Sequence, residues 1–135
     1  MKFMIMMTDD GITGEERVMG MFTCPMRIET MDGRRSLDLE ATVDTGAAYT
    51  VVPGTKLREM GVEPRGLRRF KLADGTTIEG AFGEVVATLD GDTATTQVIF
   101  GADAGPTLLG AYTLEGFALA VDPVQQRLVP AVMIL

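Results

Sequence analysis

Three Asp-Gly pairs, each lying between runs of strand-like residues, constrain the fold of this 135-residue chain more than any other feature. An Asp-Gly pair provides the positive φ angles of a tight hairpin turn, so alternating apolar residues on both sides of it predict two antiparallel strands. The pairs begin at Asp32, Asp74 and Asp90. Three hairpins in one short chain predict an all-β barrel or sandwich.

The apolar pattern around these turns predicts where the strands and helices lie. We expect strands over residues 22–30, 36–43, 70–73, 76–89 and 93–100. Two short helices are indicated, one over 53–60 that Gly61 would end, and one over 109–116. After a turn at Asp122-Pro123, residues 128–135 are strand-like, and Pro130 marks them as an edge strand or a bend.

The length of the chain fits one domain. Residues 20–135 carry the regular β pattern and are expected to form that domain. Polar clusters break the pattern in residues 1–19, which we expect to be an N-terminal tail or a peripheral strand. A domain of this size buries a core but leaves little volume for a deep cleft, which favours a site assembled between two chains.

Composition excludes several kinds of chemistry and of partner. The chain has no histidine, which rules out Ser-His-Asp and Cys-His mechanisms and most catalytic zinc sites. Its net charge of −7 argues against a nucleic-acid partner, because nucleic-acid-binding domains usually present a basic face. The basic residues form a single cluster, which we expect to be the solvated face of a loop. That cluster consists of Arg65, Arg68, Arg69 and Lys71.

Cysteine use and hydropathy indicate the compartment. The single cysteine, Cys24, cannot form an internal disulfide, which indicates a reducing environment. The apolar start of the chain, residues 1–7, is too short for a signal peptide, and no segment reaches transmembrane length. We therefore expect a cytoplasmic protein that does not enter a membrane.

The segment around Asp44 is the part of the sequence that suggests chemistry. Apolar residues lead out of a strand into Asp44-Thr45-Gly46, and the small Ala47 follows. Gly46 permits a sharp turn, the Thr45 hydroxyl can brace it, and the Asp44 carboxylate is held at the end of a strand. The triplet alone carries little weight, because a shuffled chain of this composition would contain it about 0.14 times. An Asp that only caps a turn would look the same.

The ordered series of motifs over residues 21–130 resembles the retropepsin-like (clan AA) aspartic proteases, specifically their small single-domain microbial members. The resemblance implies a closed acid-protease β-barrel with one or two short helices, in which each chain forms one lobe. It also implies that Asp44 is the catalytic carboxylate and that Thr45 cross-links two copies of the catalytic loop. Gly46 and Ala47 would support that loop.

Two further segments resemble hallmarks of the same family. The position of the family's flap hairpin corresponds to Ala73, Asp74, Gly75 and Thr76. The second hallmark, two apolar residues and a glycine before a short helix, corresponds to Leu108, Leu109 and Gly110. The flap tip lacks the glycine-rich sequence of the viral enzymes and so departs from the family pattern.

A single Asp-Thr-Gly implies a homodimer. Hydrolysis of this kind uses two carboxylates, one that takes a proton from water and one that donates a proton to the scissile carbonyl. A symmetric pair of chains would bring Asp44 beside its copy. Water attacks directly, so we expect no metal, no cofactor, and an extended peptide or protein as the substrate. The apolar segments 1–7 and 131–135 would either join the chains as strands or remain loose or edge segments.

Two other functions stay open beside an aspartic endopeptidase. A protease-like dimer could bind peptides with little or no turnover, which the small size and the unusual flap tip favour. A purely structural β-domain in a larger assembly is the third, and the acidic composition and apolar termini allow it.

Overall fold

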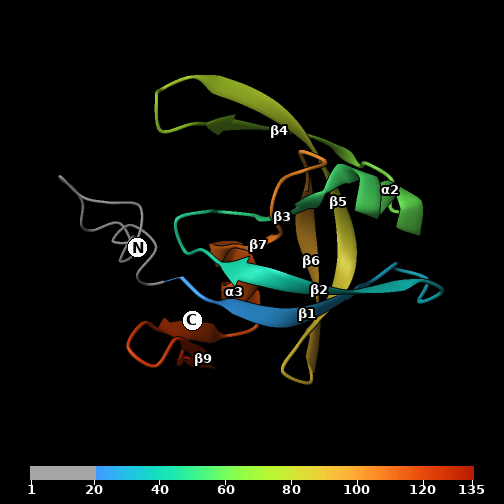
Figure 1. Ribbon diagram of the computed structural model, residues 1–135. Helices are drawn as coiled ribbons and strands as arrows, with labels where there is room; N and C mark the ends of the chain where they lie inside the picture. The colour runs from blue at the N-terminus through green and yellow to red at the C-terminus, as the bar shows by residue number, and fades with distance from the viewer. Residues whose placement is uncertain (1–20) are drawn as a thin grey trace.

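The computed structural model describes residues 21–135, and this part of the chain is built mainly from strands (Figure 1). The tail or strand expected over residues 1–19 lies outside the described residues. Along the described chain the elements are β1 (Thr23–Glu29), β2 (Ser36–Val43), β3 (Thr50–Pro53), α2 (Gly54–Met60), β4 (Gly66–Lys71), β5 (Thr77–Leu89), β6 (Asp92–Gly101), β7 (Leu108–Leu109), α3 (Ala111–Gly116), β8 (Leu119–Asp122) and β9 (Arg127–Pro130). The all-β prediction is confirmed.

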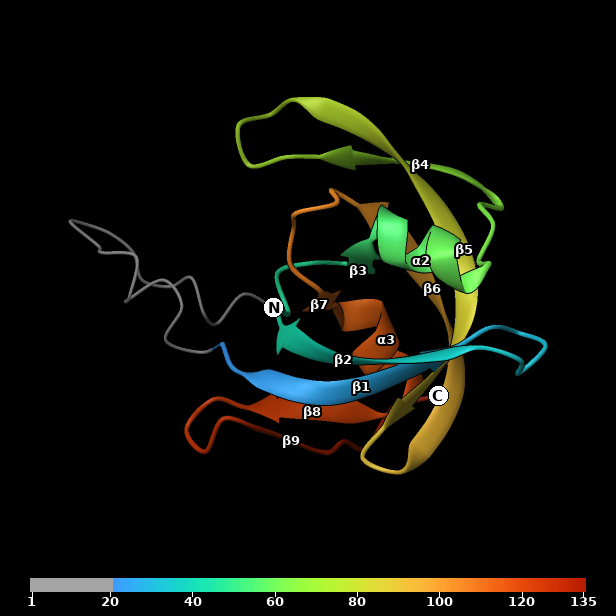
Figure 2. The ribbon, with the colours of Figure 1, turned by 45° about the vertical axis from the view of Figure 1, so that its right-hand side comes forward.

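Seven of these strands form one sheet in the order β1-β2-β7-β3-β6-β5-β4. The first strand, β1, also pairs with β5, so the hydrogen-bonded neighbours form a closed circuit of six strands. The remaining strand of the sheet, β4, lies outside this circuit and pairs with β5. A separate hairpin of β8 and β9 lies along β1 (Figure 2).

The Asp-Gly pairs that begin at Asp32, Asp74 and Asp90 all form hairpin turns, as predicted. Their glycines, Gly33, Gly75 and Gly91, have φ angles of 73°, 90° and 83°. These values lie in the region that other residues resist, so glycine is needed at each turn. The turns connect β1 to β2, β4 to β5 and β5 to β6.

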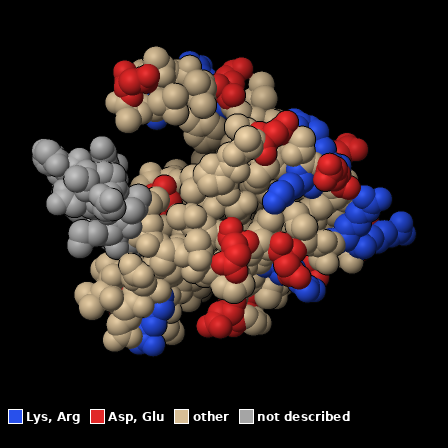
Figure 3. Space-filling model, viewed as in Figure 1, with Lys and Arg blue, Asp and Glu red and all other residues tan. Residues whose placement is uncertain are grey.

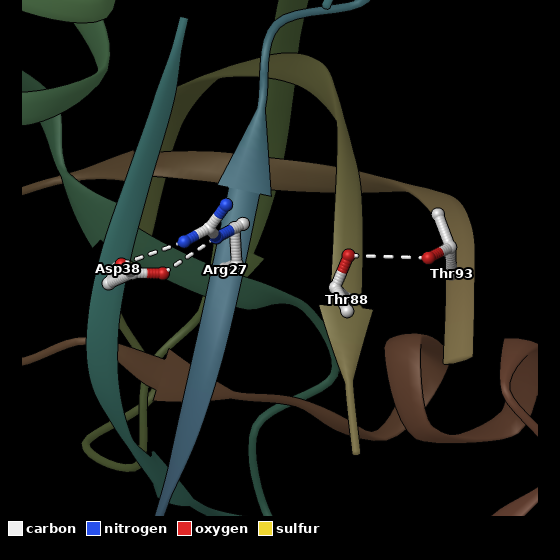
Figure 4. A network of polar contacts seen from close by, with 4 residues as sticks. All are labelled: Arg27, Asp38, Thr88 and Thr93. Carbon is white, nitrogen blue, oxygen red and sulfur yellow. Dashed lines mark hydrogen bonds and ion pairs between the residues drawn. The ribbon is translucent and has the colours of Figure 1, made fainter. Parts of the chain in front are cut away.

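Cross-strand side-chain pairs show the register that these turns set. Arg27 lies opposite Asp38, and its guanidinium donates to both carboxylate oxygens over 2.8 and 3.1 Å (Figure 4). Thr88 lies opposite Thr93, with their hydroxyl oxygens 3.3 Å apart. Both pairs are exposed, so they report the register and add little to stability.

The end of the first helix agrees with the prediction, whereas the second helix, the C-terminal strand and the basic loop need adjustment. The first helix, α2, ends at Gly61 with φ of 93°, as expected. The second, α3, begins only at Ala111, because the two leucines before it pair as β7. Residues 131–135 form no strand, since β9 ends at Pro130. The predicted basic loop face is largely the strand β4, where Arg68 lies 3.8 Å from the centre of the Phe82 ring.

The core fills the space enclosed by the circuit of strands. Alternate residues of β2 point inward, as its sequence pattern predicts, and α2 contributes one face. The fully buried large side chains are Met26, Ile28, Leu57, Leu89, Leu109, Val52, Val85, Val98, Thr50 and Thr113. Of these, Leu109, Thr50 and Thr113 come from β7, β3 and α3, which connects the core directly to the site described below.

Charged side chains of both signs are spread over the face shown in Figure 3. A recess is visible on this face beneath the projecting β4–β5 hairpin. Across residues 21–135, every helix is too short or too polar to span a bilayer.

Candidate active site

Asp44 follows the last residue of β2 and opens the loop of residues 44–49, which we call the Asp44 loop. The amide of Asp44 donates to the carbonyl oxygen of Leu109 over 3.0 Å, which ties the loop to β7. The amide of Gly46 donates to Oδ1 of Asp44 over 2.9 Å, and the amide of Ala47 donates to its backbone oxygen over 3.1 Å. Backbone and carboxylate of Asp44 are therefore both held in place.

The short strand β7 joins the two predicted motifs. It pairs in parallel with the end of β2 and antiparallel with β3 at Val51. Gly110 follows it and lies directly against the Asp44 loop. A Cβ at Gly110 would clash with the backbone oxygen of Tyr49 and would lie 3.0 Å from that of Ala47. Only glycine fits there without a backbone shift, because real Cβ contacts are longer than 3.0 Å.

The first residues of helix α3 are hydrogen-bonded to the same loop. The amide of Ala111 donates to the oxygen of Ala47 over 2.8 Å, and the amide of Tyr112 donates to the oxygen of Ala48 over 2.9 Å. The sequence therefore identified two segments, 44–47 and 108–110, that the fold brings into contact across more than 60 residues of chain. Whether they act in catalysis remains a prediction.

A chain of threonine hydroxyls, two of them fully buried, lies beneath this contact, and the sequence did not predict it. The amide of Gly110 donates to Oγ1 of Thr50 over 3.0 Å. That oxygen lies 2.6 Å from Oγ1 of Thr113, which lies 2.7 Å from Oγ1 of Thr96. The chain links β3, α3 and β6 under the loop. No spacing rule in the sequence distinguishes these threonines from the other thirteen.

The hydroxyl of Thr45 has no partner among the described residues. Its Oγ1 is buried, yet no hydrogen bond is made to it. Thr45 is one of the residues that line a hollow of about 200 Å³ between the Asp44 loop, α3 and β8. Buried hydroxyls are nearly always hydrogen-bonded in folded proteins, so an unsatisfied one requires an explanation.

The predicted flap residues lie at the turn of the β4–β5 hairpin, which arches over β3 and β7 in Figures 1 and 2. Asp74 closes the turn by accepting from the hydroxyl and the amide of Thr76 over 2.6 and 2.9 Å. These hydrogen bonds lower the pKa of Asp74. The structure thus places Ala73, Asp74, Gly75 and Thr76 at a hairpin tip and leaves a role in closing over substrate as a prediction.

A large cavity of the described chain lies away from this site. It measures about 740 Å³ and lies between the β1–β2 turn and the end of α2, at the opposite end of β2 from Asp44. Among residues 21–135 no group of three or more Cys, Asp or Glu side chains is placed to hold a metal ion. We consider the recess under the β4–β5 hairpin the better candidate site, because the hairpin that covers it carries the predicted flap residues.

Comparison with solved structures places this fold. The chain is similar to the simian foamy virus (mac) protease, with a TM-score of 0.50 and 18% identity, over 70% of this chain and 92% of the viral one. A foamy viral protease-reverse transcriptase, solved with an RNA/DNA hybrid, gives a TM-score of 0.53 and 16% identity, over 86% of this chain but only 13% of that one.

A Legionella pneumophila protein of unknown function gives a TM-score of 0.50 and 20% identity, over 76% of this chain and 91% of that one. No protein-family model and no curated protein matches the sequence. The predicted retropepsin-like fold is confirmed. At these identities the likeness is one of fold, so activity has to be argued from the site.

Proposed function

We propose that this chain, with its retropepsin-like fold, is an aspartic endopeptidase that acts as a homodimer, with Asp44 of each copy forming the catalytic pair. The observation that carries the proposal is the buried hydroxyl of Thr45, which has no partner among residues 21–135 and lies beside a carboxylate that is firmly held. Leaving a buried polar group unsatisfied costs roughly 1–3 kcal/mol. A second copy of the Asp44 loop, related by a twofold axis, would offer that hydroxyl a partner.

The chemistry of such a pair follows from its charge. Two carboxylates a few Å apart resist double ionisation, so they share one proton and titrate as a unit. The ionised Asp44 takes a proton from water, and the water oxygen bonds to the carbonyl carbon of the peptide. The protonated Asp44 of the second copy gives its proton to the carbonyl oxygen, which yields a neutral tetrahedral diol.

The diol then collapses to products. The carboxylate formed in the first step takes a proton from one hydroxyl, the other carboxyl gives its proton to the leaving nitrogen, and the C–N bond breaks. The products are a carboxylic acid and an amine. Water supplies every added atom, so the proposal requires no covalent intermediate, metal or cofactor.

Cleavage of a library of unstructured peptides between pH 3 and 7 tests the proposal. We expect turnover by the wild type and none by Asp44→Asn, which keeps the size of the side chain but cannot act as a base. The matched control is Asp38→Asn, because Asp38 is exposed on β2, the strand that leads into Asp44. Equal turnover by the wild type and Asp44→Asn would refute the protease.

The edge position of β4 favours a second candidate function, a peptide-binding dimer with little or no turnover. β4 is the last strand of the main sheet, and an edge strand can add an extended peptide through backbone hydrogen bonds. This function predicts that library peptides bind the wild type and Asp44→Asn equally well and that neither cleaves them. Turnover that disappears in Asp44→Asn excludes it.

A further inference from the structure

Three aromatic rings connect the β4–β5 hairpin to the Asp44 loop. Tyr49, the last residue of the loop, meets Phe70 of β4 with ring centroids 5.7 Å apart and planes at 80°. On its other side it meets Tyr112 of α3 at 5.1 Å and 81°. Both are edge-to-face contacts, an arrangement that aromatic pairs favour. The ring of Tyr49 thus lies between the hairpin and the helix.

The hairpin leaves room for Phe70 in this position. Phe70 lies opposite Ile78 in the register of β4 and β5, and Gly80 lies two residues further along β5. A Cβ at Gly80 would lie 3.3 Å from both the Phe70 ring and the side chain of Ile99. The missing side chain at Gly80 therefore lets the Phe70 ring lie against the base of the hairpin and reach Tyr49.

Little else in the described chain supports the outer part of the hairpin. Near its tip, Leu72 and Ile78 are 44% and 46% exposed. Both ribbon views show the hairpin projecting from the circuit of strands (Figures 1 and 2). An isolated two-stranded hairpin is marginally stable in water, so a contact that fixes it to the body of the domain matters. The Tyr49–Phe70 pair is such a contact.

The other side of the cluster is part of the Asp44 loop. The residue before Tyr49 accepts a hydrogen bond from the amide of Tyr112 over 2.9 Å, and Gly110 packs against the backbone of Tyr49. Asp44 itself is bonded to Leu109, two residues before α3. Tyr49 and Asp44 are therefore held by the same short segment, and a hairpin that docks on Tyr49 is positioned relative to Asp44.

We propose that Tyr49 is a positioning residue that docks the β4–β5 hairpin over the Asp44 loop through Phe70. Its role in peptide hydrolysis rests on the proposed function, but the docking is a property of the chain without ligand. Removing the ring frees the hairpin. An edge-to-face pair favours the docked hairpin roughly 2- to 12-fold, and this sets the size of the expected effects.

Amide hydrogen exchange of the ligand-free protein tests the docking. The reporters are the amides of Leu72 and Gly75, which bond within the hairpin tip. We expect them to exchange roughly 2- to 12-fold faster in Tyr49→Ala, while Tyr49→Phe, which keeps the ring, exchanges at the wild-type rate. Leu67→Ala is the matched control. Leu67 is 59% exposed on the same strand, and its side chain lies on the opposite face of β4 from Phe70.

Exchange in the β1–β2 ladder separates docking from general destabilisation. Unchanged hairpin exchange in Tyr49→Ala, or equal acceleration in the hairpin and in β1–β2, would overturn the inference. The two tyrosines of the chain, with no tryptophan present, add a spectroscopic readout. Labelling with fluorotyrosine gives two resonances, and the Tyr49 resonance should shift in Phe70→Ala and stay in place in Leu67→Ala. A Tyr49 resonance unmoved by Phe70→Ala would contradict the contact.

Kinetics then connect docking to the proposed function. For a peptide that the wild type cleaves, Tyr49→Ala should raise KM roughly 2- to 12-fold and change kcat less, and Tyr49→Phe should restore KM. A chain that cleaves no peptide refutes the proposed function, and the exchange and fluorine experiments still decide the docking. Lost turnover in Tyr49→Ala with unchanged hairpin exchange overturns the docking and leaves the protease standing.

Discussion

Replacing Thr45 by valine separates the two states in which its hydroxyl can exist. Valine has nearly the same shape as threonine but no hydroxyl. Within the described part of a single chain, Oγ1 of Thr45 is buried and unsatisfied, so its removal should relieve an unfavourable burial. In a dimer that satisfies the hydroxyl, the same substitution removes a hydrogen bond from each copy. The substitution should therefore stabilise the single chain and weaken the dimer. The direction of the change shows whether the hydroxyl is satisfied by a second copy.

The size of the effect follows from the number of bonds. A typical intramolecular hydrogen bond contributes about 1 kcal/mol net, and twofold symmetry gives one such bond per copy. Thr45→Val should then weaken the dimer by about 2 kcal/mol, which is a rise of about 30-fold in its Kd. The monomer alone should gain up to roughly 1–3 kcal/mol, since a buried unpaired hydroxyl disappears.

Sedimentation across a range of concentrations measures the Kd of the dimer. Urea unfolding of dilute protein measures the free energy of unfolding of the monomer. Thr45→Ser is the matched control, because it keeps the hydroxyl and loses only a methyl group. We expect a weaker dimer in Thr45→Val and a smaller change in Thr45→Ser. A dimer of Thr45→Val as tight as the wild type, or tighter, would refute the assignment of this hydroxyl to the interface.

Three further outcomes follow from the described chain. Gly110→Ala should cost about 2–3 kcal/mol in urea unfolding, because its Cβ meets backbone atoms, whereas Gly116→Ala, with nothing within 4 Å, should cost almost nothing. Thr76→Ala should raise the lowered pKa of Asp74 toward its ordinary value in an NMR titration; that carboxylate stabilises the fold above its ordinary pKa and loses this effect as pH falls through the lowered pKa. Burial, followed by two nearby carboxylates, raises the pKa of the Cys24 thiol from 9.0 to about 11. Alkylation of this thiol should therefore accelerate toward pH 11 and not toward pH 9. The contribution of the thiol to the stability of the fold should fall as pH rises from 9.0 to about 11.

The parts of the fold that the sequence predicted well are local. An Asp-Gly pair needs positive φ at its glycine, and Gly33, Gly75 and Gly91 all have it. The alternation through β2 predicted which of its residues are buried, because side chains on a strand alternate between two faces. Gly61 likewise ends α2 in the left-handed conformation that the helix C-cap favours.

The parts that the sequence did not predict depend on contacts between distant residues. The helix expected over 109–116 includes Leu109, but Leu109 forms β7 with Leu108 because the two leucines fit between β2 and β3. Thr50 and Thr113 look like ordinary threonines, and only the fold brings their hydroxyls within 2.6 Å of each other. Residues 131–135 are apolar enough for a strand, yet no described strand pairs with them. Hydrophobicity alone does not provide a pairing partner.

The hydrogen bonds within the candidate site predict that the proposed dimer would join two finished halves. Within one chain, hydrogen bonds join Asp44 to Leu109 and Gly110 to Thr50. Further hydrogen bonds join the start of α3 to the Asp44 loop. These bonds hold the carboxylate whether or not a partner is present. The exception is the hydroxyl of Thr45, which is buried and finds no partner in the described part of the chain. A site that is rigid except for one unsatisfied group loses little conformational entropy when a copy supplies that group, so association should proceed by docking without refolding.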